Sequence, residues 1–159
     1  MEKIYNITGY WNMGFDYNFD EKDKWDGLIV LDEDGWFEGI VNNPANKKRI
    51  ILGMFIPEKG IEIIKIDENN MYPLLYHCKK VRNSYDGEFN ISGLLGEIRC
   101  GMAHITVTEN TIIKENGKEE LINLINNMKK NILNSYKTAV SLKPEILKRL
   151  NEKDKVLTK

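Results

Sequence analysis

Short runs of apolar and β-branched residues recur along the first two thirds of the chain, and turn-forming residues separate them. Asp34-Gly35 is the dipeptide of a type I′ hairpin turn, and the segment 57–60 places a proline three residues before a glycine. Runs of this length between turn signals are typical of β-strands. We expect about eight strands, at 4–15, 27–31, 36–41, 49–56, 61–66, 72–81, 85–91 and 97–107.

No helical pattern interrupts these strands, so most of them are joined by hairpins. Hairpin-connected strands form an antiparallel meander, which removes its exposed edges by closing on itself. The sequence therefore predicts a mainly β fold, an antiparallel up-and-down β-barrel. A sandwich of two sheets is the alternative.

The last third of the chain has a different period, with apolar residues three or four positions apart. This spacing predicts a long amphipathic helix over 118–141, and Pro144 suits the start of a second helix over 144–151. We therefore divide the chain into a barrel, 1–108, and a helical extension, 109–159. The helix either covers the barrel or pairs with a second copy, as a homodimer through 118–141. Its apolar stripe is Leu121, Ile125, Met128, Ile132, Tyr136 and Ala139.

Alternation along each strand predicts which side chains face the barrel interior. If Trp11 faces inward, every second residue from Tyr5 to Phe15 does so too. The strands at 49–56 and 61–66 are apolar on both faces, so we expect the helix to cover them. The same rule places further residues inside, namely Ile7, Gly9, Met13, Phe37, Gly39, Val41, Tyr85, Gly87, Phe89 and Ile91, and it places Asn90 outside.

Charge is unevenly distributed, although the whole chain has 23 basic and 24 acidic residues. Residues 1–108 hold 12 basic and 17 acidic side chains, a net charge of −5, whereas 109–159 hold 11 and 7, a net charge of +4. This composition excludes a disordered, a collagen-like or a generally basic nucleic-acid-binding chain. Two cysteines, no long apolar run and no signal-like N-terminus predict a cytoplasmic protein that binds neither nucleic acid nor membrane.

The first predicted strand carries Gly9-Tyr10-Trp11, and this Gly-x-Trp set resembles that of the calycin superfamily, the lipocalins and their relatives. The segments 8–14 and 34–39 are also similar to the opening hairpin of the avidin-like branch. The resemblance implies that Trp11 plugs one end of the barrel under a basic side chain from the last strand region. Arg99 is the candidate for that role, and an ordinary exposed arginine is the alternative.

The histidines and cysteines do not form a metal-binding pattern. His77 and Cys78 are neighbours on one strand and point to opposite faces, while Cys100 and His104 share a face about 13 Å apart along the strand. We therefore predict no metal site and no cofactor. Common nucleotide-binding and hydrolase motifs are also missing from the sequence, so an enzyme is the less favoured hypothesis, with His104, Cys100, Arg99 or Tyr85 as its candidate residues.

The favoured hypothesis is a non-enzymatic barrel that binds a small, partly apolar ligand through aromatic and polar side chains. One alternative is that the same aromatic residues simply fill the barrel as its core. Another is an interaction module that uses the basic amphipathic helix for self-association or docking. The candidate ligand-binding residues are Tyr5, Trp11, Phe37, Tyr76, Tyr85, Phe89, Arg99 and His104.

Overall fold

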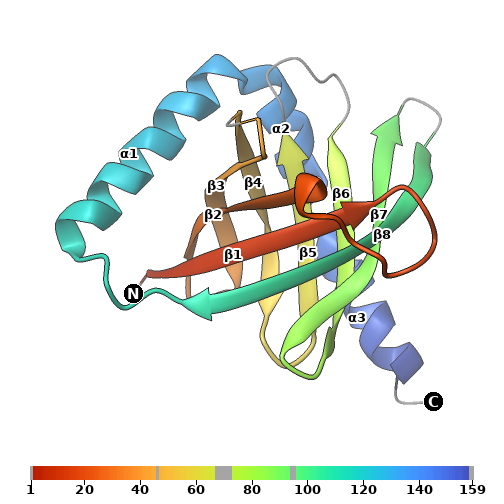
Figure 1. Cartoon of the computed structure of the whole chain (residues 1–159). Helices are drawn as coiled ribbons and strands as arrows, with labels where there is room; N and C mark the ends of the chain where they lie inside the picture. Colours follow the sequence, from red (N-terminus) through yellow and green to blue (C-terminus); the bar gives the residue numbers. More distant parts are fainter. Residues whose placement is uncertain (1, 46, 67–72, 94–95, 158–159) are drawn as a thin grey trace.

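The computed structural model describes residues 2–45, 47–66, 73–93 and 96–157, and it contains a closed antiparallel barrel followed by helices (Figure 1). The strands pair in sequence order, and β1 also pairs with β8, so the sheet closes. The predicted barrel is therefore confirmed, and the sandwich is wrong. The strands are β1 (Lys3–Asn12), β2 (Lys24–Leu31), β3 (Trp36–Asn42), β4 (Lys48–Ile56), β5 (Gly60–Ile66), β6 (Leu74–Val81), β7 (Ser84–Gly93) and β8 (Gly96–Glu109), with a short 3-10 helix, η1 (Glu21–Asp23), before β2.

The first strand is shorter than the sequence pattern suggests. Met13 and Phe15 were expected inside the barrel, but they follow the end of β1 and are 62% and 64% exposed. The Asn12 side chain ends the strand by donating to Asp16 Oδ1, at 2.8 Å, and to the Asn18 carbonyl. These bonds turn the chain away from the barrel axis, so the inward alternation stops at this point.

The turn between β2 and β3 also differs from expectation. Gly35 has a φ of +89°, but Asp34 is not in the left-handed region, so the turn is not of type I′. Instead, Asp32 Oδ1 accepts hydrogen bonds from the backbone N–H groups of Asp34 and Trp36. The Asp32 side chain thus stabilises the turn by accepting backbone hydrogen bonds, without a left-handed residue at Asp34.

Three helices follow the barrel: α1 (Glu115–Asn131), α2 (Leu133–Ser141) and α3 (Lys143–Leu157). The single helix expected over 118–141 is interrupted at Ile132, whose φ of −122° is not helical. Ile132 is 6% exposed and packs against the barrel. The breaks at Ile132 and Leu142 let short helices follow a curved wall, which one straight helix could not do.

The helices cover the outer face of the barrel along β3, β4 and β5. Ile50 and Leu52 of β4 face outward and share a core with Ile132, Ile146 and Leu150. The expectation that the doubly apolar strands are covered is therefore confirmed. The apolar stripe of the helices packs against the chain's own barrel, and Leu124 and Leu133 remain on the outer side, 38% and 48% exposed.

Buried apolar side chains fill the barrel itself. Trp25 is 1% exposed, and its indole ring lies over Gly9, its partner on β1. A Cβ atom at Gly9 would lie 2.1 Å from a carbon atom of that ring. The glycine of the Gly-x-Trp motif therefore makes room for a tryptophan of the neighbouring strand.

Candidate functional site

A cavity of about 350 Å³ lies at one end of the barrel, which we call the mouth. At this end β1, β3, β5 and β7 finish, and β2, β4, β6 and β8 begin. The volume falls within the range of small-molecule sites, about 300–1,000 Å³. Its described lining residues are Trp11, Lys22, Asn43, Pro44, Ala45, Arg49, Lys65 and Leu74.

Strand alternation explains how these side chains come together. On β1, Trp11 follows the inward positions Tyr5, Ile7 and Gly9, and on β5, Lys65 follows the inward positions Ile61 and Ile63. Arg49 of β4 and Leu74 of β6 are the corresponding end positions of their strands. The mouth therefore collects the last inward residue from four strands, and η1 adds Lys22.

A layer of aromatic rings forms the floor of the mouth. The centroids of Trp11 and Phe89 are 5.5 Å apart, those of Phe89 and Tyr76 are 5.9 Å apart, and those of Tyr76 and Trp25 are 5.6 Å apart. The Lys65 ammonium lies 5.3 Å from the centroid of the Trp25 ring. This layer separates the mouth from the packed interior of the barrel.

Two polar atoms are buried in this aromatic layer. Within the described chain, neither the indole nitrogen of Trp25 nor the hydroxyl of Tyr76 makes a hydrogen bond of normal geometry. Burial raises the pKa of the Tyr76 hydroxyl, and the nearby Trp25 N–H opposes this effect. Buried polar groups usually have a partner, so these two atoms are uncommon in a packed core.

The opposite end of the barrel is closed by another aromatic group. Phe55 lies between Tyr5 and Tyr85, with centroid distances of 6.0 and 5.4 Å. The Tyr85 hydroxyl donates to the carbonyl of Pro57 at 2.8 Å. The two ends therefore differ, because one is sealed by rings and the other is hollow.

Six of the candidate ligand-binding residues lie in the barrel interior or pack against it, and Trp11 is the one that lines the mouth. Phe89 and Tyr76 belong to the aromatic floor of the mouth, where the Phe89 ring contacts both Trp11 and Tyr76. Phe37, Tyr5 and Tyr85 belong to the packed core.

His104 lies on the outer face, contrary to expectation. Gly101, Ala103 and Ile105 are the buried positions of β8, so the histidine between them points away from the core. Its Nδ1 atom lies 2.5 Å from Oδ1 of Asp86 on β7. The pairing of β7 with β8 shifts register beside Phe89, so the residues of β8 that precede Gly101 do not follow its alternation. Cys100 therefore packs against the inner core, and the expectation that it shares a face with His104 is wrong.

Arg99 does not cover Trp11. It forms an ion pair of 2.7 Å with Glu88, its guanidinium lies 4.6 Å from the centroid of the Phe15 ring, and its side chain is 53% exposed. The alternative of an exposed surface arginine is therefore confirmed. Sequence reasoning instead missed Lys22, Arg49 and Lys65, although inward alternation from Ile51 and Ile63 would have indicated the last two.

A second hollow, of about 340 Å³, lies on the outer face of β6, β7 and β8. Its histidine, His77, is buried between Glu62 of β5 and Arg149 of α3. Because arginine can only donate, Nε2 of His77 accepts from Arg149, and Nδ1–H donates to Glu62. The Nε2 contact fastens α3 to the barrel, and the Nδ1 contact joins β6 to β5.

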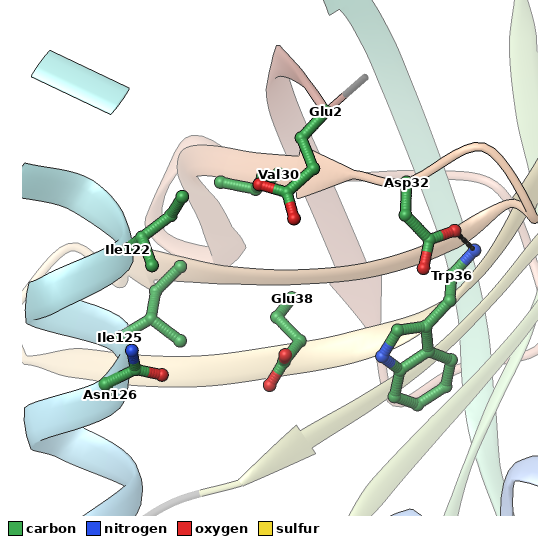
Figure 2. A pocket seen from close by; sticks show the side chains of 8 residues that line it. All are labelled: Glu2, Val30, Asp32, Trp36, Glu38, Ile122, Ile125 and Asn126. Atoms are coloured by element: carbon green, nitrogen blue, oxygen red, sulfur yellow. Dashed lines mark hydrogen bonds between the residues drawn. The ribbon is translucent and has the colours of Figure 1, made fainter. Parts of the chain in front are cut away.

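A third cavity, between α1 and the β2–β3 hairpin, measures about 100 Å³, room for a few water molecules. Figure 2 shows the carboxyl groups of Glu2, Asp32 and Glu38 around it, and Ile125 of α1 beside them. The Asp32 carboxylate accepts a hydrogen bond from the Trp36 backbone. Small volume and internal bonding make this a structural cavity, so the mouth is the better candidate site.

No group of three or more histidine, cysteine, aspartate or glutamate side chains in the described residues is arranged to hold a metal ion. Within the same residues, no helix has the length and apolar character needed to span a membrane. Comparisons of this chain with protein-family models, with curated proteins and with solved structures find no match.

Proposed function

We propose that this chain is a non-enzymatic binding module of calycin type, and that it holds a small, partly apolar molecule in the mouth of its barrel. The observation that carries the proposal is the cavity of about 350 Å³ at the hollow end. Trp11 and Leu74 give this cavity apolar contact surface, and Asn43 and the basic residues give it polar groups. Such a combination is typical of small-molecule sites.

The packed interior supports a site at the mouth and not deep in the barrel. Phe37, Ile51 and Ile63 are each 1% exposed or less and belong to the core that fills the barrel. A ligand seated on the aromatic floor needs no rearrangement of the core, whereas a ligand inside the barrel would have to displace close-packed side chains. We therefore expect binding to involve Trp11 directly.

Binding is favoured over catalysis because the described lining residues include no imidazole, thiol or carboxylate. His77 and His104 lie on the outer face, each beside a carboxylate. General acid–base and nucleophilic catalysis most often use these groups, held within hydrogen-bond reach of the substrate.

Native mass spectrometry of the protein purified from cells that produce it tests the proposal. The spectrum is recorded before and after unfolding, for the unaltered chain and for Trp11→Leu, with Lys80→Ala as an exposed control away from the mouth. We expect a small molecule that is released on unfolding, present with Lys80→Ala and depleted with Trp11→Leu. A folded protein that carries no such molecule and shows no added mass in any variant would contradict the proposal.

The alternative function is self-association or docking through 118–141. One observation supports it, since Leu124 and Leu133 are accessible on the outer side of the helices. In the same spectra this alternative predicts a ligand-free dimer or a co-purified protein. Leu133→Glu would then dissociate the complex, because the substitution places a charge in its apolar contact.

A further inference from the structure

The hollow on the outer face of β6, β7 and β8 combines charges of both signs with apolar surface. Its volume of about 340 Å³ falls within the range of small-molecule sites. Tyr17 comes from the loop between β1 and η1, and the other side chains come from the three strands. The residues that matter for its chemistry are Tyr17, Lys79, Asp86, Glu88 and Met102.

Lys79 and Asp86 carry opposite charges and do not pair with each other. They are direct partners across β6 and β7, a position in which opposite charges usually attract one another into contact. Here Oδ1 of Asp86 lies 2.5 Å from Nδ1 of His104 instead, and in the described chain Lys79 forms no ion pair with a carboxylate. The hollow therefore holds a basic and an acidic group side by side, each able to receive a group of a ligand.

The two carboxylates of the hollow each have an oxygen atom left for a ligand. Glu88 uses Oε2 for its ion pair of 2.7 Å with Arg99, and Asp86 uses Oδ1 for His104. The second oxygen of each accepts no hydrogen bond from any residue that the structure describes. An ammonium group has three N–H donors and no acceptor, so it suits these two oxygens.

Tyr17 supplies an aromatic wall to the hollow. Its side chain is 51% exposed, and its ring packs edge-on against Phe19 with the centroids 6.0 Å apart. Burial raises the pKa of the Tyr17 hydroxyl, and the negative charge of Asp86 adds to this effect. The carboxylate is therefore close enough to act on a group that occupies the hollow, while the Tyr17 ring offers that group's apolar neighbour a contact surface.

The loop that carries Tyr17 is held in place by the chain itself. The Asn12 side chain donates to Asp16 Oδ1 at 2.8 Å, and the Phe19 ring packs against the His104 ring of β8 at 6.0 Å. The loop accordingly runs beside β8 (Figure 1). A wall that is already ordered loses little conformational entropy when a ligand binds, which favours binding.

From these observations we infer that the outer hollow binds a small zwitterion, namely an α-amino acid with an apolar side chain. Its ammonium group lies between Asp86 and Glu88, its carboxylate lies at Lys79, and its side chain rests on Tyr17 and Met102. A zwitterion is favoured over a simple amine or a simple acid because it uses both signs of charge in the hollow. The inference does not depend on the proposed function, since it concerns a second site outside the barrel.

Calorimetric titration with three probes of similar shape tests the inference. L-Phenylalanine carries both charges, 2-phenylethylamine carries the ammonium group alone, and 3-phenylpropanoate carries the carboxylate alone. We expect L-phenylalanine to bind about tenfold more tightly than either of the others. Asp86→Asn should remove its advantage over 3-phenylpropanoate, and Lys79→Gln should remove its advantage over 2-phenylethylamine. Lys80→Gln, at an exposed lysine outside the described lining, is the control and leaves all three affinities unchanged.

Absence of binding, equal affinities for the three probes, or an undiminished preference in both charge variants would overturn the inference. Because Asp86→Asn also removes the partner of His104, its thermal melting curve is compared with that of the unaltered chain. Glu88→Gln, at a side chain that is 39% exposed, tests the ammonium site a second time.

A nitrogen-15 correlation spectrum locates the bound amino acid. L-Phenylalanine should shift the backbone amide signals of Gly87 and Met102 and leave the indole N–H signal of Trp11 in place. A shift of the Trp11 signal alone would place the amino acid in the mouth, which overturns the inference and leaves the proposed function standing. A mouth that binds no small molecule would instead contradict the proposed function and leave the outer site unaffected.

Discussion

Gly9 illustrates how one residue sets the geometry of the hollow end. Because a Cβ atom there would lie 2.1 Å from the Trp25 ring, Gly9→Ala forces the indole to move. We expect this overpacking to lower the free energy of unfolding by about 1–3 kcal/mol. Urea denaturation measures the change, and Gly14→Ala is a matched control because its nearest contact is the Asn12 side chain at 3.3 Å. Equal midpoints for the two variants would contradict the assigned contact.

Arg82 is strained by the turn that joins β6 and β7. Its φ of 60° lies in the left-handed region, and it is the one non-glycine residue there in the described chain. Glycine adopts this conformation without steric cost, so Arg82→Gly is expected to raise the free energy of unfolding by about 1 kcal/mol. Asn83→Gly, at the next position, lacks this benefit and should not stabilise. A loss of stability in Arg82→Gly, measured by thermal unfolding, would show that the strain is not the dominant effect.

Single residues also show where sequence reasoning works. Alternation correctly predicted the inward positions of Trp11 and Phe37, because it depends on backbone geometry alone. It also placed Asn90 outside correctly: Asn90 pairs with Leu75, an outward residue of β6, and is buried on that outer side, 4% exposed. Lys65 was overlooked because a lysine is rarely expected at an inward position.

At the scale of elements, Glu38 of β3 fastens the helices to the barrel. Its carboxylate accepts a hydrogen bond of 2.7 Å from the Tyr136 hydroxyl and pairs with Lys129. Burial and the bond to Glu38 raise the pKa of Tyr136 above its ordinary value of 10.0. In the unfolded chain this tyrosine ionises at its ordinary pKa, while in the folded chain it keeps its proton to higher pH.

The stability that Tyr136 contributes is therefore fully present below pH 10 and is lost progressively as the pH rises above it. We expect Tyr136→Phe to make the free energy of unfolding fall less steeply between about pH 9 and pH 11. Urea denaturation across this range measures the slope. Burial also raises the pKa of Tyr85, which is still present in the variant. Some loss of stability at alkaline pH is therefore expected to remain in Tyr136→Phe. An unchanged slope in Tyr136→Phe would contradict the assigned coupling.

Removal of the helices tests their covering role. A chain that ends at Asn110 would expose outward apolar residues of β4 and β5, such as Leu52 and Ile64, which are fully buried in the intact chain. We expect this truncated chain to aggregate, and static light scattering would detect it. A soluble monomer with a strand-type circular dichroism spectrum would show that the barrel does not need its cover.

The elements themselves were largely predictable from the sequence. The turn-forming residues located all eight strands, because a hairpin turn favours particular residues at its own positions in the sequence. The helix break at Ile132 was missed, since an isoleucine in an apolar stripe gives no local reason to end a helix. That break follows from the curvature of the wall beneath, which is a tertiary effect.

At the scale of the whole molecule, a filled barrel with one hollow end accounts for most of the observations. Closure by pairing of β1 with β8, and the filling of the interior, depend on long-range contacts that no local pattern encodes. The same is true of the mouth, where Trp11, Lys22, Arg49 and Lys65 come from distant parts of the chain.

The three tryptophans allow the most direct test of the mouth as the binding site. Trp11 lines it, Trp25 lies under Lys65, and Trp36 lies on the outer face beside Lys143. Titration with 1-naphthylacetate, followed through the indole N–H resonances in a nitrogen-15 correlation spectrum, reports on all three. We predict that the Trp11 and Trp25 signals shift together while that of Trp36 stays in place. A titration that moves the Trp36 signal alone, or none of the three, would contradict the account.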